Sequence, residues 1–392
     1  MSSSREQSNL PDSTSDELHL SHPSEEECNT IWTRTAASWR DALSVSIYLK
    51  ESLYLTTVPL ARGGGMTTWV LVDKSLPPGK RVVLCSCESY IKRSISSDRS
   101  GNLTETVVHG IASVFCPEDL RHRGYAARMM KELAKIFVTW NVPLGRKCIG
   151  SLLYSDIGKD YYAKLGWRPA PINCHVVLKA TDDSIVEPSE EISKIDLASL
   201  CERDEAMIRK SLRIPAEETK SRFTVIPDLD HMLWHISKEE FYCETLFGKE
   251  APVKGAIAGA PGNQVWAIWV RRYYDELDSE SPDNVLYILR LVVPGVSPEV
   301  GEGEGPRDHI KQVSNLKAVI QAAQKEAFEW KLPEVHLLNP IPAVQKMLKE
   351  TEIEFELAER DELNIASGMW YDEHGKEGET PEWLNGEYYS WC

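Results

Sequence analysis

The stretch over residues 107–140 constrains the fold of this chain more than any other. An apolar run ends at Phe115, the turn Arg121-His-Arg-Gly-Tyr-Ala126 follows, and apolar residues then recur at helical spacing. These features predict a buried strand, a glycine-containing turn and an amphipathic helix. The backbone N–H groups at the start of such a helix have no partner within the helix, so they can hold an anion. The turn by itself fits two interpretations, a tightly packed helix start or an anion-binding site.

Helices and strands alternate along the first half of the chain. Spacing and turn residues predict helices over 24–41, 126–140 and 160–165, and strands over 69–72, 82–90, 107–115, 148–154 and 173–179. The run over 53–58 fits either a helix or a strand. This order of elements indicates an α+β fold with a mixed sheet.

The second half repeats this order. We expect a helix over 197–212, strand-like runs over 231–236, 253–260, 264–272 and 285–293, a helix over 309–330, a strand over 335–338, a helix over 343–349 and a strand over 354–358. We interpret the chain as an internal repeat of one architecture without obvious sequence identity. Because 392 residues exceed one ordinary core, we expect two domains. Their predicted bounds are 17–180 and 196–392, with a disordered tail over 1–16 and a polar linker over 181–195.

Composition and charge exclude several classes of protein. No apolar run approaches the roughly 18 residues of a membrane span, and the first residues resemble neither a secretory signal nor a transit peptide. The net charge of −16 argues against unspecific nucleic-acid binding. The nine cysteines include no C-x-x-C pair, which argues against a zinc site and favours reduced thiols. We therefore expect a cytoplasmic protein without membrane or nucleic-acid partners, and the sequence carries no signal for an oligomeric state.

A second motif changes the interpretation of the turn. Farther along the chain stands Tyr161-Tyr-Ala-Lys-Leu-Gly-Trp167. The turn and this helix end resemble the two acetyl-CoA-binding signatures of the GNAT N-acetyltransferases, in the same order and at a similar separation. The resemblance covers residues 17–180. It implies a GNAT fold with a central mixed sheet, acetyl-CoA as cosubstrate and no metal.

Further segments of the sequence resemble a narrower group, the fungal L-lysine N6-acetyltransferases. These segments lie at residues 85–90, 109–117, 153–156, 322–330 and 388–392. The resemblance implies direct transfer of acetyl to the ε-amine of free L-lysine, a small-molecule substrate, in lysine breakdown. The second half would then be a degenerate GNAT-like domain that shapes the substrate cleft.

The GNAT resemblance also assigns roles to particular residues. The strand whose backbone pairs with pantetheine ends at Val114, Phe115 and Cys116. The loop that would hold the pyrophosphate through its backbone N–H groups consists of Arg121, His122, Arg123, Gly124, Tyr125 and Ala126. Ser155 and Asp156 would lie near the thioester. Tyr162 would protonate the departing CoA thiolate, and a core tyrosine is the alternative interpretation of this residue.

Acetyl transfer to an amine requires a neutral nitrogen and a proton for the leaving sulfur. A lysine side chain has a pKa of about 10.4, so its deprotonation at pH 7 costs roughly 4–5 kcal/mol and calls for a base. The candidates are Glu88 and His109, each on a strand expected to face the cleft, with Asp156 behind them. A solvated glutamate and a core histidine are the alternative interpretations. Cys116 is expected to be a small buried side chain rather than a nucleophile.

Three further features bear on the second half. Aromatic residues crowd the last ten positions and predict a buried chain end, which either seals the domain interface or brings the terminal carboxylate to the active site. His231 and His235 lie four residues apart, but the intervening residues resemble a strand, so we expect no metal there. Two glutamates in the run over 301–307 would repel a pyrophosphate, which indicates that this half does not bind CoA.

The sequence leaves two other functions open. One is acetylation of another small amine or of protein lysines. The other is a non-catalytic acetyl-CoA sensor.

Overall fold

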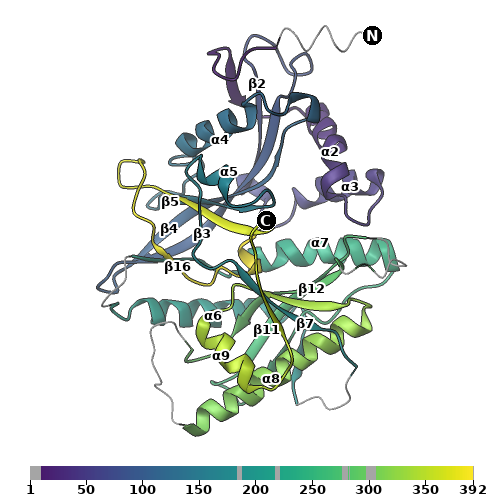
Figure 1. Cartoon of the computed structure of the whole chain (residues 1–392), viewed down its shortest axis with the longest axis vertical. Coiled ribbons are helices and arrows are strands. Elements are labelled where there is room, and N and C mark those ends of the chain that lie inside the picture. Colours follow the sequence, from purple (N-terminus) through teal and green to yellow (C-terminus); the bar gives the residue numbers. More distant parts are fainter. Residues whose placement is uncertain are drawn as a thin grey trace.

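The chain folds into two halves, each built around its own β-sheet (Figure 1). The computed structural model describes residues 10–182, 188–216, 221–275, 281, 283–296 and 306–391. Residues 1–9 of the predicted tail and the middle of the predicted linker lie outside these ranges. The α+β fold class predicted from the sequence is confirmed.

The first sheet occupies the upper half of Figure 1. Its strand order is β1-β2-β3-β4-β5-β15-β6, and β9 pairs with β3 and with β16. Along this order β4 and β5 are parallel, whereas the other neighbours are antiparallel. The bounds are β1 Leu18–Ser21, β2 Met66–Asp73, β3 Cys85–Ser97, β4 Leu103–Phe115, β5 Lys147–Ser155, β6 Arg168–Pro169, β9 Arg222–Val225, β15 Ile365–Trp370 and β16 Glu382–Trp383.

The second sheet has the order β14-β7-β13-β12-β11-β10-β8. Here β12 and β13 are the parallel pair. The bounds are β7 Cys174–Lys179, β8 Glu190–Ile192, β10 Gly255–Ala258, β11 Val265–Arg272, β12 Val285–Val292, β13 Glu334–Leu338 and β14 Glu356–Glu359. The parallel pair has the same place in both sheets, which agrees with the predicted repeat of architecture.

The two halves exchange strands: β7 joins the second sheet, and β9, β15 and β16 join the first. β7 follows the first-half elements in the chain but pairs with β13 and β14 in the second sheet. β15 lies near the other end of the chain and inserts between β5 and β6 of the first sheet. The expected boundary at residue 180 therefore does not coincide with the division between the sheets, because β7 lies on the other side of that division.

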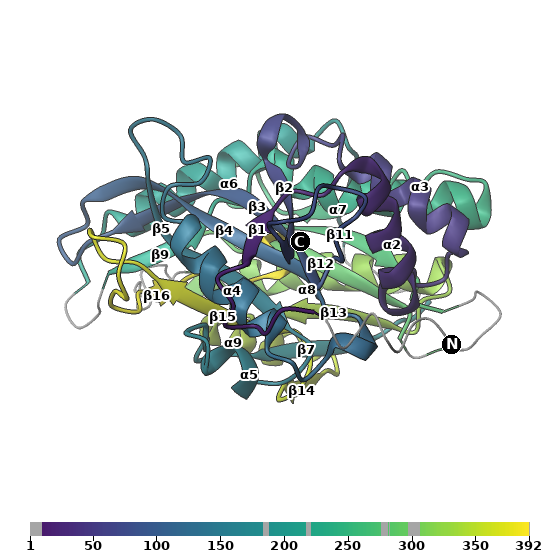
Figure 2. The same ribbon diagram turned by 90° about the horizontal axis from the view of Figure 1, so that it is seen from above.

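Helices flank both sheets, most of them near the predicted positions. Their bounds are α2 Glu25–Trp39, α3 Val45–Leu55, α4 Tyr125–Ile136, α5 Asp160–Ala163, α6 Leu197–Leu212, α7 Leu229–Phe247, α8 Pro306–Glu329 and α9 Pro342–Glu350, with short 3₁₀ turns η2 Arg62–Gly64, η3 Glu118–Leu120 and η4 Tyr388–Ser390. The undecided run over 53–58 begins in the last residues of α3. Seen from above, α2 and α3 lie side by side, apart from α4 (Figure 2).

The strand predicted over 231–236 is wrong, because these residues lie in α7. This helix begins after the N-cap Asp228 and ends at Gly248, which has a left-handed conformation. α7 contacts α3, α6, β11 and η4, so it is buried on several sides. Its apolar residues therefore alternate in a way that resembles a buried strand.

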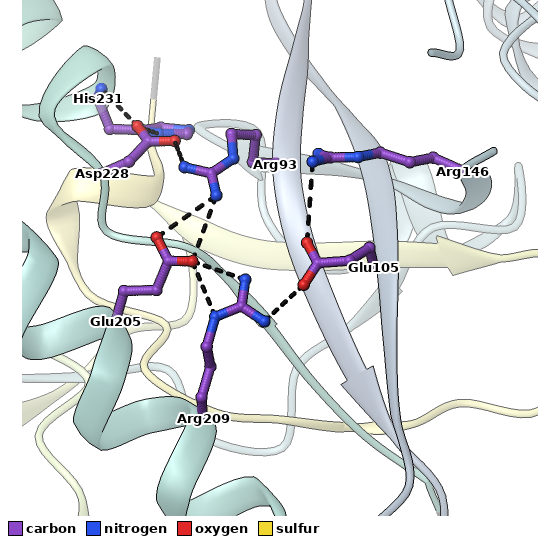
Figure 3. A network of polar contacts seen from close by, with 7 residues as sticks. All are labelled: Arg93, Glu105, Arg146, Glu205, Arg209, Asp228 and His231. Carbon is purple, nitrogen blue, oxygen red and sulfur yellow. Dashed lines mark hydrogen bonds and ion pairs between the residues drawn. The ribbon is translucent and has the colours of Figure 1, made fainter. Parts of the chain in front are cut away.

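Ion pairs and apolar packing join the two halves. Arg209 on α6 pairs with Glu105 on β4 at 2.5 Å and with Glu205 at 2.6 Å (Figure 3). Arg93 on β3 pairs with Glu205 and with Asp228, each at 3.3 Å. One apolar cluster also contains residues of α2 together with residues of β7, α7 and α8. The halves therefore pack as one body around a shared interface.

Candidate active site

A cavity of about 1070 Å³ lies between the two halves. The first half contributes residues of α2, α3, β3, β4, β5 and α5 to its walls. The second half contributes residues of α7, β12 and β13 and the segment 359–364. Tyr388 and Trp391, near the end of the chain, line another part of it. Neither half alone encloses this cavity.

β4 and β5 separate at the edge of the cavity. They pair in parallel as far as Ile111 and Leu153. Beyond this point β4 continues to Phe115 alongside β3, whereas β5 continues alongside β15. Ser113 has a φ of 53° at a shift in the β3–β4 register, and such a bulge bends its strand. Ser113 and Val114 line the cavity at this opening between β4 and β5.

The other two residues expected to end this strand pack nearby. The ring of Phe115 meets that of Trp39 edge-on, with centroids 6.0 Å apart. The thiol of Cys116 donates to the carbonyl oxygen of Leu84 at 3.5 Å. A hydrogen bond with Cys85 lowers the pKa of the Cys116 thiol. The side chains of Phe115 and Cys116 therefore have partners within the protein.

The turn before α4 has the backbone of an anion site. His122 and Gly124 have φ values of 61° and 84°. The first helical hydrogen bond runs from the N–H of Arg128 to the carbonyl oxygen of Gly124, at 3.0 Å. The N–H groups of Tyr125 and Ala126 precede this bond, so they have no acceptor within the helix. Such groups are suited to a phosphate.

The side chains of the turn make local contacts. Arg121 donates from Nε to the carbonyl oxygen of Cys116 at 3.2 Å. The Arg123 guanidinium lies 5.3 Å from the ring centroid of Tyr125. The Tyr125 hydroxyl donates to the carbonyl oxygen of Pro11 at 2.7 Å. These three side chains thus contact other parts of the chain.

Two features favour glycine at position 124. Its positive φ is unfavourable for other residues. In addition, a Cβ at this position would lie 2.7 Å from Oγ of Ser13. The segment before β1 thus passes close to the turn.

Tyr162, the residue expected to act as the acid, borders the cavity. It is on α5, lines the cavity and is 8% exposed. Burial raises the pKa of its hydroxyl, which keeps the group protonated. Tyr161 packs against it edge-on at 5.0 Å. Tyr162 therefore presents a proton donor to the cavity.

The two residues expected near the thioester differ in their surroundings. Ser155 is buried, donates to the carbonyl oxygen of Gly158 at 2.8 Å and accepts from the N–H of Ile157 at 3.2 Å. It shapes the turn after β5. Asp156 lines the cavity and accepts from the N–H of Asn364 at 3.0 Å. Burial raises the pKa of the Asp156 carboxyl.

Glu88 lies on β3 and lines the cavity beside the opening. Its carboxylate accepts hydrogen bonds from Oγ of Ser113 at 3.1 Å and from the hydroxyl of Tyr90 at 3.3 Å. Burial raises the pKa of this carboxyl above its ordinary value of 4.5. A carboxylate with a raised pKa next to the opening has the properties of a general base.

His109, the other candidate base, is not among the residues that line the cavity. It is 1% exposed and stacks on Phe137 at 4.4 Å. Its environment is that of the core histidine considered as the alternative interpretation.

The histidines of α7 have protein partners. His231 bonds Asp228 through Nδ1 at 2.7 Å, and His235 lies 3.4 Å from the carbonyl oxygen of Tyr389. Within the described residues, no group of three or more histidine, cysteine, aspartate or glutamate residues could hold a metal ion. In the same part of the chain, no helix has the length and apolar character needed to cross a bilayer.

Charged residues that the sequence analysis did not single out also line the cavity. Lys238 Nζ lies 3.6 Å from Oε1 of Glu51, and Arg272 pairs with Asp41 at 2.5 Å. Burial raises the pKa of Glu51 and lowers that of Lys238. The partners lie on elements far apart in the sequence, so no local pattern could have identified them.

The corresponding opening in the second sheet is filled by the chain itself. β12 and β13 pair in parallel as far as Ile288 and Leu337. Just beyond, the N–H of Leu291 donates to Oε2 of Glu387 at 2.7 Å, and η4 packs against β12. Most of the run over 301–307, whose glutamates were expected to repel a pyrophosphate, lies outside the described residues.

The predicted burial of the chain end is confirmed up to the last described residues. Tyr388 and Tyr389 are 6% and 0% exposed. Oγ of Ser390 lies 2.5 Å from the Tyr154 hydroxyl, and its carbonyl oxygen accepts from Lys92 at 2.8 Å. Cys392 lies outside the described residues.

A family model described as the LYC1 GNAT-like C-terminal domain matches residues 175–392, more than half of the chain. The chain belongs to this family. The match begins within β7, so it coincides with the change from the first sheet to the second. The GNAT recognition made from the turn and from residues 161–167 is therefore confirmed.

Two curated relatives match parts of the chain. A Saccharomyces cerevisiae protein, YGR111W, is 26% identical over 245 residues, which cover 54% of this chain and 61% of that protein. A lysine acetyltransferase from Yarrowia lipolytica is 27% identical over 143 residues, 33% of this chain and 35% of that protein. The aligned parts thus span less than two thirds of either relative. The Yarrowia match relates the chain to the fungal lysine acetyltransferases.

Solved structures show the same fold. A GCN5-related N-acetyltransferase from Kribbella flavida has a TM-score of 0.50 and 15% identity, covering 93% of this chain and 74% of its own. One from Anabaena variabilis has a TM-score of 0.51 and 12% identity, covering 90% of this chain and 72% of its own. The predicted GNAT fold is confirmed, and both neighbours extend over the two halves.

Proposed function

We propose that this chain transfers the acetyl group of acetyl-CoA directly to the ε-amine of free L-lysine. The observation that carries the proposal is the meeting of three features at one cavity. These are the opening between β4 and β5, the Tyr162 hydroxyl and the Glu88 carboxylate. Residues 17–180 without β7, together with β9, β15 and β16, would form the catalytic domain, and the second half would close the cleft.

The backbone of the first half fits acetyl-CoA as cosubstrate. N–H groups in the turn from Arg121 to Ala126 would hold the pyrophosphate, since the start of α4 leaves them without helical acceptors. The strand end at Val114 and Phe115 would pair with the pantetheine through its backbone. When bound, acetyl-CoA supplies the thioester carbon that the amine attacks.

Glu88 would act as the base that prepares the amine. A lysine amine binds its proton with a pKa of about 10.4, so the neutral form must be generated in the site. The raised pKa of Glu88 makes its carboxylate a better proton acceptor than a solvated glutamate. Ser113 and Tyr90 hold the carboxylate in place by hydrogen bonds.

Tyr162 would act as the acid that protonates the leaving thiolate. Its buried hydroxyl keeps its proton at neutral pH. Because Glu88 and Tyr162 lie on different elements that both line the cavity, the two proton transfers need no shared group. Direct transfer also needs no covalent enzyme intermediate, so Cys116 has no role as a nucleophile.

Two arguments support a small amine, and L-lysine in particular. Walls from both halves line the cavity, which favours a small substrate over a protein tail. Five segments of the sequence resemble the fungal L-lysine N6-acetyltransferases, and the Yarrowia relative bears the name lysine acetyltransferase. We accordingly place the activity in lysine breakdown in the cytoplasm.

A steady-state assay tests the proposal. Acetyl-CoA is supplied with a panel of amines that includes L-lysine, L-ornithine, pentane-1,5-diamine, glucosamine and a lysine-containing peptide, and release of free CoA is recorded. We expect the highest kcat/KM with L-lysine. Equal turnover of the peptide would reject the small-molecule substrate, and binding of acetyl-CoA without turnover of any amine would favour a sensor.

A further inference from the structure

Several arginines that are buried or half-buried in the described part of the second half are neutralised by carboxylates. The ion pairs are Arg271 with Glu239, Arg272 with Asp41, and Arg290 with Asp204. Despite their burial, the pKa of each of these guanidinium groups is raised by its carboxylate. This is the usual arrangement of a charge that is removed from water.

Arg360 is different. It follows β14, is 6% exposed and lines the cavity between the halves. Its Nη1 donates to the carbonyl oxygen of Asn364 at 2.7 Å, and its Nη2 donates to Oδ1 of Asn339 at 2.8 Å. Nε has no acceptor, and none of the described carboxylates forms an ion pair with this guanidinium. Burial accordingly lowers the pKa of Arg360.

The partners of Arg360 fix its position without neutralising its charge. Asn339 is itself tied to β7 and to the chain end, through the N–H of Cys174 at 3.2 Å and the carbonyl oxygen of Gly386 at 2.7 Å. The backbone N–H of Arg360 donates to the carbonyl oxygen of Asn173 at 2.8 Å. The guanidinium is therefore held rigidly in the cavity wall, and three of its five N–H bonds have no acceptor among the described residues.

The groups around Arg360 do not provide a close counter-charge. His175 and His336 stack at 5.0 Å beside it in the wall, and burial lowers the pKa of both, to about 4 for His175. Both histidines are neutral at pH 7. Asp156 attracts Arg360 from a distance, and Asn364 lies between them, donating its N–H to the aspartate.

We propose that Arg360 binds the carboxylate of the amine substrate, and so selects amines that carry a carboxylate away from the reacting nitrogen. The inference rests on the proposed acetyl transfer to an amine. The planar guanidinium matches a carboxylate through two parallel N–H bonds, and such a pair is strongest where water is excluded. Glu88 on β3 receives the proton of the amine, and Arg360 in the second-half wall holds the other end of the substrate.

The test compares two substrates that differ only in the carboxylate, L-lysine and pentane-1,5-diamine. For the wild type we expect kcat/KM to be at least about 30-fold higher with L-lysine. Arg360→Gln should remove most of this preference by raising the KM for L-lysine, while kcat/KM for the diamine changes little. Equal activity of the wild type on both substrates would overturn the proposal, and so would an equal loss on both in a folded variant.

Two controls separate binding from folding. Arg168→Gln replaces an arginine that pairs with Glu377 at the surface, 65% exposed, and should leave the ratio of the two substrates unchanged. The affinity of Arg360→Gln for acetyl-CoA and its melting temperature report whether the cavity survives. Arg360→Lys keeps the positive charge but cannot donate two parallel N–H bonds, so it should retain only part of the preference for L-lysine over the diamine.

A binding measurement keeps this inference distinct from the proposed activity. Calorimetric titration of L-lysine into the protein with CoA needs no turnover. If the chain acetylates no amine but Arg360→Gln still weakens L-lysine binding by at least about 30-fold, the proposed function fails and the carboxylate site stands. Unchanged L-lysine affinity in the variant would overturn the carboxylate site.

Discussion

At the scale of single residues, burial sets the protonation states of the two side chains proposed for catalysis. Tyr162 holds its proton because its phenolate would be desolvated, and Glu88 holds its proton to a higher pH than an exposed glutamate. These states suit an acid and a base respectively. Tyr161, a neighbour of Tyr162, and Glu329, an exposed glutamate, serve as controls for Tyr162 and Glu88.

Tyr162→Phe should lower kcat by about 100- to 10,000-fold, the usual contribution of a general acid, without changing the KM for acetyl-CoA. Tyr161→Phe alters a neighbour that packs edge-on against Tyr162 and should keep kcat within about threefold. Steady-state kinetics on both variants provides the comparison. Similar losses in the two would mean that Tyr162 acts through packing rather than proton transfer.

Glu88→Gln should remove the acid limb of the pH profile. In the wild type we expect kcat to rise with pH through an apparent pKa above 4.5, because only the ionised carboxylate accepts a proton. Glu329→Gln, on the exposed face of α8, should keep the wild-type limb. An unchanged limb in Glu88→Gln would assign the base elsewhere.

Ionisation of the Glu88 carboxyl is expected to raise kcat but to lower the stability of the fold. Because its folded pKa is raised, its contribution to stability is greatest below pH 4.5 and is lost as pH rises through the folded pKa. Glu88→Gln should therefore gain melting temperature relative to the wild type at pH 8, and this gain should shrink at pH 4.5. A gain that does not depend on pH would argue against the raised pKa.

At the scale of elements, the exchange of β7 and β15 determines how the halves stay together. Each sheet contains a strand supplied by the other half of the sequence. A protease site inserted between Asp182 and Pro188 should therefore give two fragments that co-elute in size-exclusion chromatography and keep activity. Separation of the cut fragments under native conditions would contradict the exchange.

The exchange also shows why the sequence predicted some elements and not others. The turn at Gly124 and the amphipathic pattern of α4 are local signals, so both were located from sequence. β15 pairs with β5 across more than two hundred residues, as Ile365 with Ser155 shows, and no local pattern marks such a partner. The α7 run resembled a strand because burial on several sides hides the helical period.

At the scale of the whole molecule, buried neutral histidines make stability depend on pH. Burial lowers the pKa of His109 to about 4 and that of His235 to about 3. The unfolded chain therefore binds protons first, and stability is lost as pH falls through 6.5 toward these values. Between pH 7.5 and pH 5, each such histidine should cost about 2 kcal/mol of unfolding free energy.

His109→Leu should reduce the loss of unfolding free energy between pH 7.5 and pH 5 by the contribution of one histidine, about 2 kcal/mol. Urea unfolding of the wild type and the variant at both pH values gives the difference, in which other titrating groups cancel. The same fall in both proteins would show that His109 is not buried in the neutral form. Because His109 does not line the cavity, we expect the variant to keep its acetyltransferase activity at pH 7.5.

The candidate site was predictable in part. The GNAT resemblance indicated Tyr162, the turn at Gly124 and the strand end at Val114, which belong to motifs. It could not separate Glu88 from His109, because both lie on strands and only the fold shows which faces the cavity. Arg360, Lys238 and Arg272 come from the second half and meet the first only through tertiary packing, so no spacing in the sequence predicts them.

The proposed acetyl transfer predicts one specific product. The protein is incubated with acetyl-CoA carrying a ¹³C-labelled acetyl group and with L-lysine, and the product is identified by NMR and mass spectrometry. We predict N6-acetyl-L-lysine as the labelled product, formed by the wild type and nearly absent with Tyr162→Phe. Labelling of the α-amine instead, or no labelled lysine from a protein that binds acetyl-CoA, would contradict it.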